Sequence, residues 1–156
     1  MTNEKESTFL VTHVESDSAV LKDVHDGQVH TLGSNPGLAV DDAVEATVAP
    51  DPPLEVTYQV IEVDERRSLS IDRSDEPPTV QERELAADLQ PGELAREPRA
   101  GVGEIHVLCP PEGGTEDAVD DVLEDREGTL SRAARLGVNR VEIRSEPRVL
   151  SVRYLP

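Results

Sequence analysis

The chain has 156 residues and a formal net charge of −18, with 33 acidic side chains against 15 basic ones. Only Lys5 and Lys22 are lysines, and the other thirteen basic residues are arginines. Surface carboxylates hold water and cations, and their mutual repulsion falls in molar salt, where the Debye length is about 3 Å. The composition therefore indicates a halophilic protein with an acidic surface that needs high salt (K⁺) to fold. The sequence shows no DNA-binding signature.

The single cysteine and the hydropathy pattern predict the compartment. Cys109 has no second cysteine with which to form an intrachain disulfide, which fits a reducing interior. No apolar run approaches the length of a membrane span, and the polar residues 1–7 do not resemble a signal peptide. We therefore expect a cytoplasmic protein with no membrane partner.

The sequence of the first half of the chain predicts short strands separated by turns. Alternation is clearest where Val44, Ala46 and Val48 face inward. Five or six short strands at this spacing predict a small β-barrel of the OB or SH3-like sort over residues 1–73. The expected strands cover residues 8–14, 19–24, 28–32, 42–48, 56–63 and 68–71.

The composition changes at residues 73–78, which we take as the domain boundary. Thr79 and Glu82 form a capping box that opens a helix, so residues 74–102 read as a linker with a capped helix followed by a loop. Helices are expected from Thr115 and over 129–136, ending at Gly137. With strands over 104–109, 138–144 and 148–155, residues 103–156 predict an α/β domain. Its three-stranded mixed sheet has helices on one face, and the whole chain is of the α+β class.

Six short strings in both halves of the chain carry a resemblance to a known family. They are FLVTH (9–13), GQVHTL (27–32), NPGL (35–38), PPLEVTY (52–58), AARLGV (133–138) and VRYLP (152–156). In these strings the chain resembles a haloarchaeal family of uncharacterised proteins, a domain of unknown function, and this resemblance implies no activity or ligand. Residues 8–73 also look like small barrels of the OB, TRAM and S1 types in the placement of their turns.

The hairpin at Asp26-Gly27 contains the candidate metal ligands. A two-residue turn places Asp23 opposite His30, with His25 on the same face. Two imidazoles and a carboxylate form a potential divalent metal site. The alternative is a polar solvent face with one ordinary Asp–His contact, and we therefore expect no metal.

The terminal hairpin is the least acidic part of the chain. Alternation places Arg140, Arg144 and Arg153 on one face of the sheet, where they form a candidate anion- or partner-binding strip. The alternative is that they pair with Glu142 and neighbouring acids. RNA binding at such a strip is weakened by salt and would need stacking aromatics, of which the chain has three in all.

Three functions remain open from the sequence. The first is a non-enzymatic binding or adaptor module with a protein partner. The second is an RNA-associated accessory protein that uses the barrel or the arginine strip. The third is an enzyme with a site at the inter-domain cleft near Cys109 or at the Asp23/His30 face. Because no catalytic triad, carboxylate pair or nucleotide fingerprint stands out, we expect no catalytic residues and no cofactor.

Overall fold

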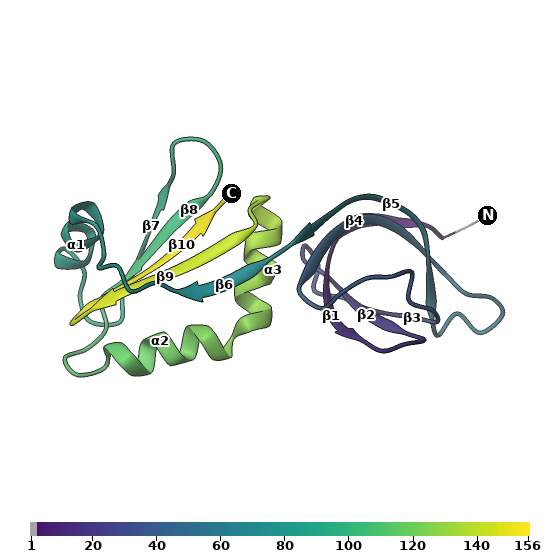
Figure 1. The fold of residues 1–156 in the computed structure, drawn as a ribbon, viewed down its shortest axis with the longest axis horizontal. Coiled ribbons are helices and arrows are strands. Elements are labelled where there is room, and N and C mark those ends of the chain that lie inside the picture. The colour runs from purple at the N-terminus through teal and green to yellow at the C-terminus, as the bar shows by residue number, and fades with distance from the viewer. Residues whose placement is uncertain (1–2) are drawn as a thin grey trace. The chain divides into compact units, whose positions relative to one another are not determined.

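The computed structural model describes residues 3–156, which form a mixed α+β fold with two five-stranded sheets and three helices (Figure 1). Two compact units divide the chain, residues 1–69 and 70–156. The predicted α+β class is confirmed, whereas the layout of the second sheet differs from the prediction. None of the helices in the described residues is both long and apolar enough to cross a membrane.

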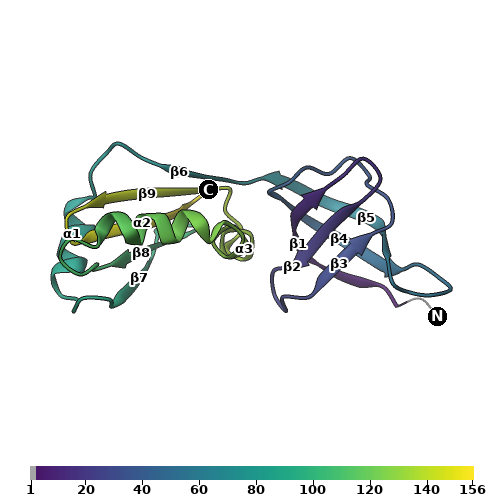
Figure 2. The same cartoon turned by 90° about the horizontal axis from the view of Figure 1, so that it is seen from below.

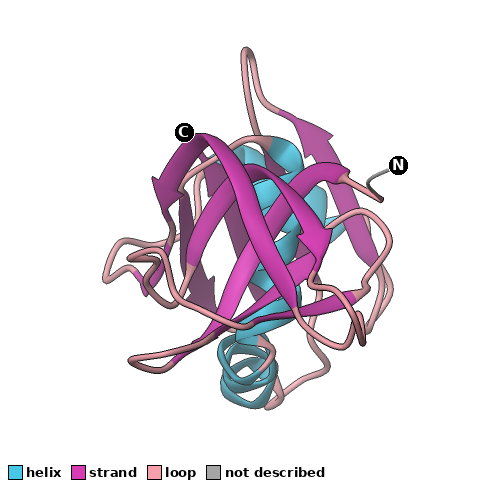
Figure 3. Cartoon of the chain, turned by 90° about the vertical axis from the view of Figure 1, so that its right-hand side faces the viewer, coloured by secondary structure: helices cyan, strands magenta, loops and turns pink. Residues whose placement is uncertain are grey.

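The first unit is built from strands and turns, with no helix among its described residues (Figure 3). Its strands close into a barrel in the order β1-β2-β3-β5-β4. Neighbouring strands are antiparallel except β3 and β5, which are parallel. The bounds are β1 Lys5–Val14, β2 Ala19–Asp23, β3 Val29–Leu32, β4 Asp42–Pro50 and β5 Tyr58–Ser68.

The barrel interior is filled by alternate residues of its strands, as a period of two requires. Val44, Ala46 and Val48 face inward as predicted and are fully buried. Small and β-branched side chains dominate this core because the chain has few aromatics to fill it. The other core residues are Phe9, Val11, Ala19, Leu21, Leu32 and Leu38.

The second unit contains a mixed sheet in the order β6-β9-β10-β8-β7, in which only β6 and β9 are parallel. The predicted three-stranded sheet is therefore wrong by two strands. Ser70–Arg73 was expected in the barrel but pairs with β9. Leu94–Pro98 was expected in a loop that carries arginines and glycines, but it pairs with β8. The bounds are β6 Ser70–Arg73, β7 Leu94–Pro98, β8 Glu104–Leu108, β9 Arg140–Glu146 and β10 Val149–Leu155.

The helices α1 (Val80–Ala87), α2 (Thr115–Glu124) and α3 (Arg126–Leu136) cover both faces of this sheet. Ala86 of α1 packs against Val107 and Val149. His106, next to Val107 in β8, points to the opposite face and lines a cavity together with residues of α2 and α3. Figure 2 shows α2 and α3 following one another along the sheet. The prediction of helices on one face is therefore wrong.

Local signals at the helix ends are confirmed. The Thr79 side chain accepts from the Glu82 amide while the Glu82 carboxylate accepts from the Thr79 amide, which completes the capping box. Gly137 ends α3 with φ of 74°, a left-handed conformation that glycine adopts without steric cost.

Candidate functional site

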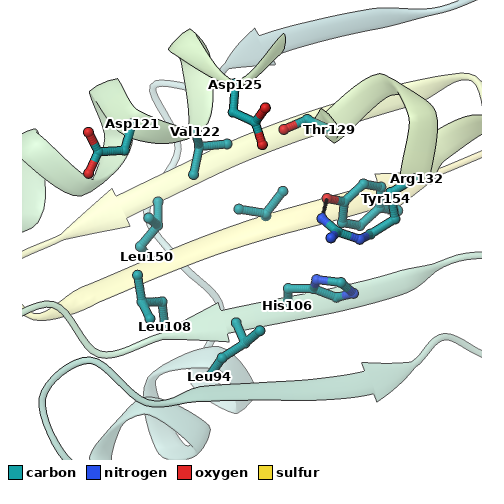
Figure 4. Close-up of a pocket in the computed structure, with 11 residues that line it drawn as sticks. Leu94, His106, Leu108, Asp121, Val122, Asp125, Thr129, Arg132, Leu150 and Tyr154 are labelled. Carbon is teal, nitrogen blue, oxygen red and sulfur yellow. Dashed lines mark hydrogen bonds between the residues drawn. The ribbon is translucent and has the colours of Figure 1, made fainter. Parts of the chain in front are cut away.

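A cavity of about 220 Å³ lies between the sheet of the second unit and helices α2 and α3 (Figure 4). It is smaller than the roughly 300–1,000 Å³ of pockets that hold drug-sized ligands, so its size suits one side chain or a small molecule. Leu94 of β7 is 47% exposed and therefore lies where the cavity meets solvent. The other apolar lining residues are Leu108, Val122, Leu150 and Val152.

His106 of β8 is a buried titratable group in this lining. Burial lowers the pKa of His106 below its ordinary value; its hydrogen bond to Glu104 opposes that shift, and the charges of Arg132 and Arg96 add to it. Nε2 lies 2.8 Å from Glu104 Oε1. Because a carboxylate only accepts hydrogen bonds, the neutral ring donates from Nε2 and keeps Nδ1 as an acceptor.

Tyr154 of β10 lies beside His106, with ring centroids 4.8 Å apart. Arg132 Nη1 of α3 donates to the Tyr154 hydroxyl at 3.1 Å (Figure 4). A hydroxyl that accepts from arginine still has its own hydrogen to donate. This part of the cavity therefore offers one hydrogen-bond acceptor and one donor beside an apolar surface.

Acidic side chains lie on the helical side of the cavity. Asp121 and Asp125 both contribute to the lining, and Asp125 is the residue between α2 and α3. A Cβ at Gly128 would lie 2.5 Å from an Asp125 carboxylate oxygen, so glycine allows α3 to begin this close to it. The cavity thus carries acids on its helical side and the Arg132–Tyr154 pair near His106.

Two of the three candidate metal ligands meet inside the barrel, but around an ammonium group. Lys5 Nζ lies 3.0 Å from Asp23 Oδ2, 2.8 Å from Asp26 Oδ2 and 3.4 Å from His30 Nε2. We call Lys5, Asp23, Asp26 and His30 the Lys5 cluster. His25 lies in the exposed turn. In residues 3–156, no group of three or more His, Cys, Asp or Glu side chains is arranged to hold a metal ion.

The hairpin register differs from the predicted one by two residues. His30 pairs with Leu21, and the Asp23 amide donates to Gln28 O, so four residues form the turn instead of two. Asp23 Oδ1 accepts from the His25 amide at 2.8 Å, which favours the longer turn. A shift of two residues preserves the face, and for this reason Asp23 and His30 still share the barrel interior.

The electrostatics of the Lys5 cluster follow from burial and hydrogen bonding. Burial alone would raise the pKa of Asp23, but the His25 amide, Lys5, Ser7 and the Asp26 amide donate to it and lower its pKa to about 2. Burial and the Lys5 charge lower the pKa of His30. The cluster is therefore an ion-paired network around the Lys5 ammonium group, with the imidazole of His30 as its neutral member.

In the predicted arginine strip, Arg144 and Arg153 form ion pairs with acidic side chains, and Arg140 is exposed. Arg144 pairs with Glu142 and with Glu76, and Arg153 pairs with Glu142 at 2.6 Å and Glu82 at 3.3 Å. The side chains of Arg144 and Arg153 are 15% and 17% exposed. Glu142 thus stands between these two guanidinium groups, while Arg140 is exposed at the start of β9.

Cys109 follows β8 and is buried, with Sγ 3.8 Å from Pro110 O. It lines a hollow on the α1 side of the sheet together with Ala86 and Val149. His106 faces the α2–α3 side, so it does not serve Cys109 as a base, as the three-residue spacing predicted.

Comparison with known proteins gives one match. The model of a family of unknown function (DUF5812) matches residues 5–145. The chain belongs to DUF5812. Neither the curated proteins nor the solved structures contain a match to it. The expected membership of an uncharacterised family is confirmed.

The DUF5812 match runs from the first residue of β1 into β9, so it includes residues of both compact units. It also includes most of the cavity lining, which sequence reasoning missed. The signal was present in Glu104 and His106, two residues apart on an expected strand and therefore on one face. What the sequence did not indicate was that Tyr154 and Arg132 would lie beside them.

Proposed function

We propose that this DUF5812 protein is a non-enzymatic binding module, an adaptor whose second unit receives an apolar side chain of a partner protein. The observation that carries this proposal is the small apolar cavity with the half-exposed Leu94 in its lining. Protein interfaces concentrate their binding energy in a few apolar anchors that fill such pockets. A buried leucine side chain contributes about 1.5–3 kcal/mol.

The polar groups of the cavity support binding rather than catalysis. Glu104 is hydrogen-bonded to His106, and Arg132 is hydrogen-bonded to Tyr154. Glu104 therefore holds the imidazole in place, and Arg132 holds the phenol ring. The described residues that line the cavity include no cysteine or serine, and its one threonine, Thr129, is 4% exposed. The lining therefore has no serine or cysteine nucleophile for His106 to activate.

Filling the cavity tests this function. We expect N-acetyl-leucinamide to bind with a dissociation constant on the order of 10 mM and to shift the NMR signals of His106 and Val152. Val122→Phe occupies the cavity and weakens that binding at least about 10-fold. Val80→Phe is the matched control, since Val80 is a helical valine that is 65% exposed and lies outside the lining. Equal binding by both variants would refute the cavity as the site.

RNA association through the barrel is a second candidate, supported by the strand order. Five strands in the order β1-β2-β3-β5-β4, closed between β4 and β1, match the Greek-key barrel of OB folds, which bind oligonucleotides beside strands 2 and 3. A hollow of about 450 Å³ lies there, with Val20, Val29 and Thr31 in its lining. His13 is the aromatic ring in that lining available for base stacking.

The barrel candidate predicts binding of a labelled oligouridylate in 2 M KCl, measured by fluorescence anisotropy. Val29→Glu places a charge in the hollow and should weaken that binding at least about 10-fold. Val102→Glu adds the same charge at an exposed valine of the second unit and serves as the control. Absence of binding by the unmodified protein rejects this candidate and leaves the cavity proposal untouched.

The proposed setting is the cytoplasm of a haloarchaeon. All 33 acids lie in the described residues 3–156, and of these Asp23, Asp42 and Glu82 alone are buried, which supports an acidic exterior. Such a surface favours folding in concentrated potassium salts.

A further inference from the structure

We infer that the partner's segment binds as an added β-strand along β7, placing an acidic side chain opposite Arg96 and an apolar side chain opposite Leu94 at the cavity. This inference rests on the proposed function and names the mode and chemistry of the partner. It follows from the hydrogen-bond pattern of β7, from the faces of its side chains and from its charges.

The outer edge of β7 offers backbone groups to a partner. β7 is the last strand of its sheet, and within residues 3–156 it pairs with β8 alone. Glu93 O accepts from the Cys109 amide, and the Arg99 amide donates to Gly103 O, so the odd-numbered residues bond toward β8. In an antiparallel ladder the alternate residues, Leu94 and Arg96, then direct their N–H and C=O groups outward.

The same residues place their side chains on the cavity side. Leu94 and Arg96 pair with Leu108 and His106, which both line the cavity. Cross-strand neighbours stand about 4.5–5.5 Å apart between Cβ atoms. The partner residue opposite Leu94 therefore lies at the cavity, and the one opposite Arg96 meets an exposed guanidinium group.

These positions define a short recognition pattern. Read from its N-terminus, an antiparallel partner strand meets Arg96 before Leu94, so its sequence is acidic, any residue, then apolar. The middle residue lies opposite Ala95 and faces the α1 side of the sheet. Pro98 has no N–H, so the outer edge of β7 offers only the Leu94 and Arg96 donors.

Charge disfavours a second copy of this chain as the partner. An antiparallel β7–β7 pair centred on Arg96 or Glu97 places that charged residue opposite itself, and one centred on Ala95 places Glu93 opposite Glu97. Like charges directly opposite each other destabilise strand pairing. A pair centred on Leu94 avoids like charges, but it places Arg96 opposite Gly92, where the guanidinium group gains no acidic partner. A different chain with an acidic residue opposite Arg96 avoids the conflicts and supplies that partner.

Hydrogen exchange on the full chain tests the inference. The probe is the peptide acetyl-Ser-Glu-Ser-Leu-Ser-amide, titrated into the protein in the salt in which it folds. We expect the amides of Leu94 and Arg96 to exchange more slowly on binding, because they gain hydrogen bonds. The peptide should bind about 10-fold more tightly than N-acetyl-leucinamide, since two ladder pairs are added.

Matched peptides and one charge swap separate the outcomes. N-methylation of the peptide's leucine nitrogen should weaken binding about 3–10-fold, whereas methylation of the preceding serine, whose N–H points away, should change it less than about 2-fold. Arg96→Glu should weaken binding of this peptide. A peptide with lysine in place of its glutamate should bind the Arg96→Glu variant as tightly as the original peptide binds the unmodified protein. Equal binding of the reversed peptide acetyl-Ser-Leu-Ser-Glu-Ser-amide, or unchanged exchange at Leu94 and Arg96, overturns the strand mode. If the strand mode fails but N-acetyl-leucinamide still binds, the proposed function stands and the added-strand inference alone is rejected. If N-acetyl-leucinamide does not bind either, the proposed function itself is rejected.

Discussion

In 0.1 M KCl the protein is expected to be largely unfolded and to gain its fold cooperatively as KCl rises to 3 M. A net charge of −18 on 156 residues repels itself strongly at low ionic strength. Molar salt shortens the Debye length to about 3 Å and removes most of that repulsion. Exposed ion pairs such as Arg73 with Glu116 contribute too little to offset it. Far-ultraviolet circular dichroism across the KCl series measures the transition.

A charge-reduced variant makes this expectation sharper. Glu62, Asp64 and Glu65 are exposed on β5, so replacing them by Gln, Asn and Gln removes three negative charges without touching the core. The KCl midpoint of the variant should fall below that of the unmodified protein. Spectra and melting temperatures that do not change between 0.1 and 3 M KCl would contradict the halophilic proposal.

Lys5→Met is expected to lower the free energy of unfolding by about 2–3 kcal/mol, because it leaves the Asp23 carboxylate without its ammonium partner. Asp23 is 2% exposed and Lys5 28%, so the loss is smaller than for a fully buried pair. Urea unfolding in 3 M KCl, followed by circular dichroism, gives the difference. Lys22→Met removes the other lysine, which lies outside the Lys5 cluster, and should lower the free energy of unfolding by less than Lys5→Met does.

The effect of Lys5→Met should depend on pH. The pKa of Asp23 is about 2 in the folded protein and near 3.8 when unfolded, so its carboxylate stabilises the fold above about pH 4. That contribution is lost as pH falls toward 2. The stability difference between the unmodified protein and Lys5→Met should therefore be largest above pH 4 and shrink toward pH 2. A difference that stays constant over this range would mean that Asp23 is not the group that Lys5 stabilises.

Local sequence signals predicted the parts of this fold that depend on neighbouring residues. The Thr79–Glu82 capping box and the terminal Gly137 fix helix ends within one turn, and the alternation of Val44, Ala46 and Val48 fixes the inward face of β4. The hairpin register failed because the Asp23 side chain caps its own turn, a competition that the Asp26-Gly27 pair does not reveal. Side-chain hydrogen bonds decided that case over turn propensity.

The candidate site was harder to predict because it joins distant segments. His106 and Tyr154 come from β8 and β10, and Arg132 from α3, so only tertiary packing brings them together. The sequence did not predict β7, because Leu94–Pro98 has no β-branched or aromatic residue and is a strand through its pairing with β8. The contacts of Arg144 and Arg153 with the Glu142 between them depend on side-chain geometry, which the alternation of residues does not give.

Pro98 and the alternating charges of β7 also bear on how the protein behaves when crowded. An open sheet edge is a template on which identical chains stack into aggregates, and proline and charged residues interrupt that growth. Arg96 and Glu97 repel their own images in a neighbouring copy, while Pro98 leaves one end of the strand without a donor. The outer edge of β7 thus disfavours the stacking of identical chains, while a short strand from another protein can still pair with it.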